Sequence, residues 1–307
     1  MTNQEKGTSL VLATAFISGL AIFINKFGIK GMDPYFYTFA KNIIAGALLL
    51  SILLLAKHWP SLKKLDKADK WRLLLISIIG GAVPFLLFFK GLTMTTALKA
   101  GFIHKTLFIY VGILAAIFLK EKINKSMLFG FISLLAGSIL FLKITPQSLN
   151  LGDLFIFIAV LFWAVEIAIS KKTLQKVSGT LVATARMLGG SVFILLFLLF
   201  TGRAALFAGI DWTMLLWMAI GGVLLTGYTI TFYNGLQKIK ASVATSILTL
   251  GMAVTALLSA LFLDKSLNAQ QLLGILLMIV GVIFVSKIVR RFIKSIIFRK
   301  AKLNAST

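Results

Sequence analysis

Ten stretches of mainly apolar residues, each about 20 residues long, dominate this chain of 307 residues. An α-helix needs about 20 apolar residues to cross a hydrocarbon layer of about 30 Å. Charged residues, glycine or proline bound the stretches. We therefore predict an all-α integral membrane protein with ten transmembrane helices, at 8–28, 35–56, 71–90, 97–119, 126–142, 152–170, 180–201, 212–235, 241–263 and 270–288.

The composition supports a membrane protein and argues against several kinds of chemistry. Hydrophobic residues make up 59% of the chain and charged residues 13%, whereas a soluble domain is about half apolar and about a quarter charged. The net charge of +23 is spread between the apolar stretches, so we expect no nucleic-acid partner. With no cysteine and two histidines, disulfides and a His/Cys zinc site are not expected. We predict neither a metal nor a cofactor.

Lysine and arginine gather in alternate loops. With the N-terminus taken as cytoplasmic, 22 basic residues lie on the cytoplasmic side, seven on the opposite side and three within the stretches. Cytoplasmic loops carry an excess of basic residues. We therefore expect both termini in the cytoplasm and a multi-pass protein of the plasma (inner) membrane. We also expect the first stretch to be retained as a helix rather than cleaved as a signal peptide.

The sequence contains an internal repeat. Residues 88–144 align without a gap with 232–288 at an offset of 144, and the stretches before them align at an offset of 145. We predict one five-helix repeat at 1–146, a second at 147–288 and a basic tail at 289–307. Because five is odd, the second repeat enters the membrane from the opposite side, so the repeats are inverted. Inverted repeats place a binding site near the midplane between them, which is typical of a secondary transporter.

Three motifs carry a family resemblance: Phe162-Trp163-Ala164 in a helix that ends at Lys171, Ala185-Arg186 in the next helix, and Phe118 to Glu121 after the fourth helix. The pattern resembles the drug/metabolite transporter (DMT) superfamily, in its ten-helix EamA-type branch, over 8–288. The resemblance implies export or exchange of a small metabolite through a central cavity lined mainly by helices 1, 3, 4, 6, 8 and 9. It also implies that helices 5 and 10 pack at the periphery.

Glu166 is the carboxylate that lies well inside a predicted span. A charged group at the centre of a bilayer costs about 2.5–3.5 kcal/mol on insertion scales. We therefore expect Glu166 to face an internal cavity, where it could couple proton exchange to transport or bind a substrate amine. Trp163 and Ser170 share its helix face. The alternative is a structural partner for a lysine or for the backbone.

Basic residues also lie within the spans. Lys105 stands about 12 Å into the fourth span, where it could bind a substrate carboxylate or phosphate, or extend its ammonium group to the membrane surface. Its neighbour His104 is expected to be packed and neutral. Lys41 and Arg186 correspond in the two repeats, and both lie within reach of the surface. The resemblance assigns them a mainly structural role.

Further candidates line the predicted cavity. Thr245 and Thr249 belong to a stripe of small and polar residues on the ninth helix, which can line a cavity or allow close packing. Pro84 and Gly227 are predicted hinges. Aromatic residues occupy matching places in the third and eighth helices and suit an organic substrate, although lipid-facing positions are the alternative: Phe85, Phe88, Phe89, Tyr228, Phe232 and Tyr233.

These features favour a secondary transporter that exports a small amphipathic metabolite, an amino acid or a relative, by alternating access. The alternatives are an exchanger of phosphorylated metabolites or nucleotide sugars and, in another class, a membrane-embedded lipid-modifying enzyme. We expect no enzymatic activity, because no metal motif, paired nucleophile or phosphate-binding glycine loop is present. The segment 287–302 carries seven bases and no acid, which predicts contact with anionic lipid.

Overall fold

The computed structural model describes residues 1–29, 31–56, 65–95, 97–142, 150–263 and 267–286, together with 289 and 291. The predicted basic tail at 289–307 therefore lies almost wholly outside the described residues.

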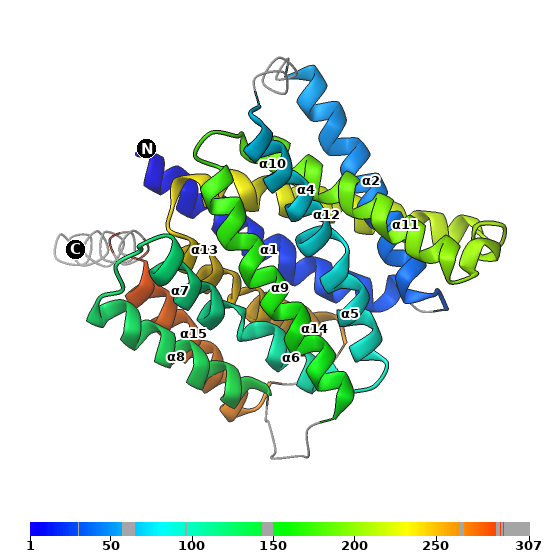
Figure 1. Cartoon of the computed structure of the whole chain (residues 1–307). Coiled ribbons are helices and arrows are strands. Elements are labelled where there is room, and N and C mark those ends of the chain that lie inside the picture. The colour runs from blue at the N-terminus through cyan, green and yellow to red at the C-terminus, as the bar shows by residue number, and fades with distance from the viewer. Residues whose placement is uncertain are drawn as a thin grey trace, which may run out of the picture.

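Helices account for nearly all of the described chain (Figure 1). The first half contains α1 (Asn3–Gly28), α2 (Pro34–Leu55), α4 (Lys67–Gly81), α5 (Val83–Leu92), α6 (Ala97–Lys105), α7 (Leu107–Phe118) and α8 (Lys125–Leu142). The second half contains α9 (Leu151–Thr173), α10 (Gly179–Thr184), the π-helix η1 (Ala185–Gly189), α11 (Gly190–Phe200), the short 3₁₀ helix η2 (Arg203–Phe207), α12 (Trp212–Lys238), α13 (Ala241–Leu248), α14 (Gly251–Phe262) and α15 (Ala269–Val285).

These elements form the predicted ten membrane helices. Eight helices of the described chain are long and apolar enough to cross a membrane, and two shorter apolar helices, Lys125–Phe141 and Ala269–Val285, complete the set. Asparagines that match in the two repeats start both shorter helices. Asn124 accepts the amide of Met127 at 2.9 Å, and Asn268 accepts the amide of Gln271 at 2.9 Å, which satisfies amide groups that a helix start leaves unpaired.

Several predicted helices contain breaks. The third is interrupted at Ala82, because Pro84 has no amide hydrogen for the carbonyl of Gly80 and its ring would clash with that carbonyl in a continuous helix. The fourth breaks at Thr106 and the ninth around Leu250, 144 residues later. In contrast, α12 continues through Gly227 without a break. A hinge role for Pro84 and Gly227 stays a prediction.

Glycines bring pairs of helices into close contact. A Cβ atom added to any of these residues would lie 2.6–3.2 Å from the carbonyl oxygen of its partner, so only glycine permits the approach. The pairs are Gly7 with Gly235 (α1 and α12), Gly91 with Gly152 (α5 and α9), and Gly130 with Gly281 and Gly137 with Gly274 (α8 and α15). Figure 1 shows α8 and α15 side by side at one edge of the bundle.

Candidate functional site

Glu166 lies in the interior of the bundle, with only 1% of its surface exposed. Its carboxylate accepts a hydrogen bond from the Ser170 hydroxyl at 2.5 Å, one turn along α9. It accepts a second from the Tyr233 hydroxyl of α12 at 2.7 Å. A buried carboxylate needs such donors, because desolvating an unpaired charge is costly. The predicted intramembrane acid is thus buried, and α9 and α12 share its contacts.

Arg186 lies beside Glu166 rather than at the membrane surface. The sequence placed Arg186 within reach of the surface, but the residue is only 7% exposed, because α4 and α2 pack against η1. The guanidinium carbon lies 5.9 Å from the ring centroids of both Phe85 and Tyr233. Its Nε atom has no hydrogen-bond partner within the described part of the chain. A buried donor without a partner is uncommon in proteins and can be satisfied by a water molecule or by a ligand.

Glu166 and Arg186 both approach the backbone of α4 at Gly80. A Cβ atom at Gly80 would lie 2.3 Å from Cγ of Glu166, 2.9 Å from its Cδ and 3.2 Å from Nε of Arg186. Both charged side chains therefore pack on the bare backbone of α4. An alanine here would displace at least one of them.

The π-helix η1 directs Arg186 into the interior. A π-turn interrupts the regular hydrogen-bond ladder and is frequent at functional sites. Ser77 of α4 donates to the carbonyl of Ala185 at 2.7 Å, so a neighbouring helix satisfies this part of the turn. A Cβ atom at Gly81 would lie 2.2 Å from the Arg186 carbonyl. The conformation of η1 thus depends on its fit against α4.

Aromatic rings cover one side of the charged pair. Trp163 is buried, and its indole nitrogen donates to the carbonyl of Gly80 at 3.1 Å. Its ring contacts Phe85 at 5.4 Å, Phe88 at 5.7 Å and His104 at 5.2 Å between centroids. These spacings are those of favourable aromatic pairs. The predicted residues Trp163 and Phe85 therefore lie in one cluster with Glu166 and Arg186.

Two more predicted residues lie on the α12 side of the cluster. Phe232 packs edge-on against Tyr233 at 5.3 Å, and it stacks on Tyr228 at 5.9 Å with an interplanar angle of 14°. Tyr233 thus connects these rings to the carboxylate of Glu166.

Other predicted residues have different surroundings. The hydroxyls of Thr245 and Thr249 are buried and donate to carbonyls of their own helix, at 3.0 Å to Ala241 and 2.7 Å to Ser246. Lys105 ends α6 and is half-buried. Its ammonium group has no hydrogen bond or ion pair with any described residue.

The sequence named Arg186, Tyr233 and Ser170 separately but did not place them together, and it did not name Gly80. A usable signal existed for Arg186: an arginine and a glutamate on consecutive predicted helices, both inside the membrane, lower each other's burial cost when they meet. No sequence signal singled out Gly80 among 25 glycines.

Charged side chains also form hydrogen bonds between helices at the end of the bundle where the N-terminus lies. Lys171, near the end of α9, donates to three carbonyls at the end of α12: Leu236 at 2.7 Å, Gln237 at 3.3 Å and Ile239 at 2.7 Å. A cation is favourable at a helix C-terminus.

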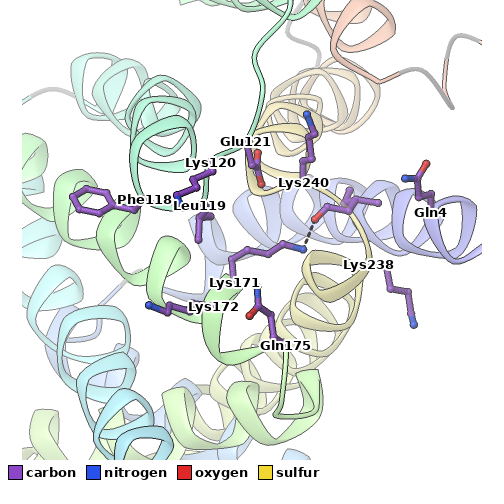
Figure 2. A pocket seen from close by; sticks show the side chains of 11 residues that line it. Gln4, Phe118, Leu119, Lys120, Glu121, Lys171, Lys172, Gln175, Lys238 and Lys240 are labelled. Atoms are coloured by element: carbon purple, nitrogen blue, oxygen red, sulfur yellow. Dashed lines mark hydrogen bonds between the residues drawn. The ribbon is translucent and has the colours of Figure 1, made fainter.

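Glu121 has the opposite role at the start of α13. It accepts the Ala241 amide at 2.7 Å, the Ser242 amide at 3.3 Å and the Ser242 hydroxyl at 2.6 Å. Together Lys171 and Glu121 hold both sides of the connection between α12 and α13, and a cavity of about 440 Å³ lies beside them (Figure 2).

The start of α4 lies at this same end. Asp66 accepts the Asp69 amide at 2.7 Å and the Lys176 ammonium group at 3.2 Å. The hydrogen bond from the Asp69 amide has the larger effect and that from the Lys176 ammonium group the smaller, and both lower the pKa of this exposed carboxyl.

Comparisons with known proteins agree with this architecture. The EamA-like transporter family matches residues 5–143 and 150–287. The chain belongs to this family, which is part of the DMT superfamily. The two matched segments together cover nearly the whole chain, so the EamA assignment rests on both halves.

Individual relatives span the same length. The uncharacterized transporter YetK of Bacillus subtilis is 26% identical over 95% of this chain and 90% of its own length. The riboflavin transporter ImpX of Fusobacterium nucleatum is 26% identical over 94% of this chain and its whole length. A solved crystal structure with 16% identity has a TM-score of 0.75 over 93% of this chain and 98% of that one, and thus shares the fold. The protein is a multi-pass membrane transporter of the EamA family.

Proposed function

We propose that this transporter moves a small amphipathic metabolite, an amino acid or a relative with an apolar or aromatic side chain, by alternating access. The observation that carries the proposal is the buried group of Glu166 and Arg186 against aromatic rings. A carboxylate can bind a substrate ammonium, and a guanidinium can bind a substrate carboxylate. The rings of Trp163 and Phe85 would contact the apolar part.

Arg186 takes the role that the sequence suggested for Lys105. Arg186 shares the Gly80 backbone with Glu166, and its Nε is free to donate. A zwitterion could therefore contact both charges at once. Lys105 is adjacent to His104, whose ring packs on Trp163, and it remains a second candidate for the substrate's anionic group.

Glu166 is also the proposed proton-coupling residue. A carboxylate that is buried among donors can take up a proton when a cationic substrate leaves, so one group would bind both in turn. Competition between the proton and the substrate for Glu166 would couple their movements without a second binding site.

The repeats supply the proposed mechanism. We propose that 1–146 and 147–288 are inverted units that exchange conformations. In this arrangement the protein spans the plasma membrane, and both termini lie in the cytoplasm. Two contacts support this arrangement, because the sequence offset relates Gly7 and Gly235 to Gly152 and Gly91.

The chain lacks cysteine, so single cysteines report topology directly. Cysteine at Ala68 should react only from inside and cysteine at Gly209 only from outside; the reverse pattern would contradict the orientation.

A second candidate substrate is a flat heteroaromatic compound, since one full-length relative is named a riboflavin transporter and the site here is rich in aromatic rings. A thermal-stability screen of the purified protein with aromatic amino acids, riboflavin and sugar phosphates separates the candidates, because a ligand that prefers the folded state raises the apparent stability. Stabilisation by sugar phosphates alone would reject the amino-acid proposal. Counterflow in proteoliposomes then tests transport of the compound that binds.

A further inference from the structure

The cavity at the N-terminal end of the bundle has an unusual excess of positive charge. Five lysines and one glutamate line it, with residues from α1, α9, the end of α7 and the connection from α12 to α13. Its volume of about 440 Å³ lies in the range of small-molecule sites. The lysines are Lys120, Lys171, Lys172, Lys238 and Lys240.

The one acidic residue that lines the cavity already has hydrogen-bond partners. Glu121 accepts three hydrogen bonds from the start of α13. Its negative charge is thereby directed to a helix N-terminus, where anions are favoured. Glu121 therefore offsets only part of the positive charge around the cavity.

Two of the lysines donate hydrogen bonds to backbone carbonyls. Lys171 donates to the carbonyls at the end of α12, and the dashed line in Figure 2 marks its bond to the carbonyl of Ile239. Lys240 donates to the carbonyl of Lys122 at 2.8 Å. These hydrogen bonds occupy donors of both ammonium groups but leave their positive charges in place, and Glu121 offsets part of the charge of Lys171.

The other three, Lys120, Lys172 and Lys238, make no hydrogen bond or ion pair with any described residue. Figure 2 shows the side chains of Lys172 and Lys238 pointing away from the half-buried Lys171. Clefts lined by charge of one sign focus the electric field and raise the local concentration of counter-ions. Flexible lysine stems at a rim can close on an anion once it arrives.

We propose that this cavity binds a phosphate group, either of a free phosphorylated metabolite or of an anionic lipid headgroup at the membrane surface. Phosphate fits because it offers several acceptor oxygens to several ammonium donors. The cavity shares no lining residue with the Glu166 cluster, and Lys171 follows Glu166 by five residues, about 7.5 Å along α9. The proposal goes beyond the transport function and does not require Glu166 to bind substrate.

The test uses the purified full chain in a nonionic detergent, with inorganic pyrophosphate as the probe and thermal stability and binding as readouts. The variant Lys120→Gln/Lys172→Gln/Lys238→Gln removes the three unpaired charges and leaves Lys171 and Lys240 to hold the backbone. The control Lys6→Gln/Lys67→Gln/Lys70→Gln removes the same charge from exposed positions at the same end of the bundle. We expect the cavity variant to weaken pyrophosphate binding about fivefold or more and the control less than about twofold.

A parallel measurement distinguishes the source of the phosphate. The same three proteins are compared in phosphatidylcholine nanodiscs with and without phosphatidylglycerol. If pyrophosphate does not bind, but phosphatidylglycerol stabilises the wild type and the control and not the cavity variant, the ligand is a lipid headgroup. Equal losses in both variants, or no stabilisation of the wild type by either probe, overturn the proposal. The binding readout stays valid whatever Glu166→Gln does to transport.

Discussion

The two halves of the chain have the same helical framework but different side chains at its centre. Glu166 of α9 aligns with Ala21 of α1, and Trp163 aligns with Ser18. Arg186 aligns with Lys41, which places its ammonium group 4.4 Å from the ring of Tyr37 and its stem against Gly221. The shared framework supplies the packing, while the second half supplies most of the charged groups of the candidate site.

Repeat symmetry therefore constrains the backbones of the two halves more strongly than their side chains. Close glycine contacts are equivalent in the two halves because helix packing fails without them. A buried charge pair is costly to maintain, so duplicating it would add cost without adding a second site. The predictions below test whether the chemistry belongs to the second half alone.

The largest effect is expected for Glu166→Gln. Glutamine keeps the shape and accepts the bonds from Ser170 and Tyr233 but cannot ionise. Proton-driven uptake or release in proteoliposomes should fall to background, and exchange should lose its pH dependence. Asp211→Asn is the control, because this exposed carboxylate caps α12 through Met214 at 2.8 Å and asparagine caps equally well. An unchanged pH profile in Glu166→Gln would remove Glu166 from the coupling mechanism.

Arg186→Gln and Lys41→Gln compare the aligned bases of the two halves. Loss of a hydrogen bond to a charged group costs about 1.5–3 kcal/mol, so Arg186→Gln should weaken binding of the identified substrate about tenfold or more. Lys41→Gln should change it less than about twofold. Arg186→Lys retains the charge and should restore folding if the first variant is unstable. Similar losses at both positions would show a symmetric site, and loss at Lys105→Ala with none at Arg186 would return the anion contact to Lys105.

Gly80→Ala and Gly227→Ala compare two interior glycines. At Gly80 the new methyl group meets Glu166 at 2.3 Å, and overpacking of this kind costs about 1–3 kcal/mol. At Gly227 the nearest atom, Cδ1 of Ile17, lies at 3.4 Å, so the helix should tolerate alanine. Thermal unfolding in detergent should show lower stability for Gly80→Ala only. Slower transport in a stable Gly227→Ala protein would support the predicted hinge.

The smallest effect is expected for Tyr233→Phe, which installs the residue found at the aligned position, Phe89. The change removes one of two hydroxyl donors from Glu166 and leaves Ser170 in place. The midpoint of the pH profile of transport should shift measurably but by less than about one pH unit, with little change in expression. A profile identical to that of the wild type would show that Ser170 alone satisfies the carboxylate.

Much of the architecture could be predicted from the sequence. Helix length and apolar composition are local properties, so the ten spans and the break near Pro84 follow from short segments. The burial of Glu166 follows from one physical fact, the cost of a charge in hydrocarbon. The pairing of Asn124 with Asn268 in the repeat alignment also corresponds to a local role, since each caps a helix.

The ten membrane helices and the interior position of Glu166 thus follow from the order of residues along the chain. The inward position of Arg186 in a π-helix, the approach of both charged side chains to Gly80 and the five lysines around one cavity depend on how the helices pack. These residues come together from positions far apart in the sequence. Arg186 meets Gly80 because α4 packs against η1, and helical periodicity specifies which face is apolar but not which helix covers it.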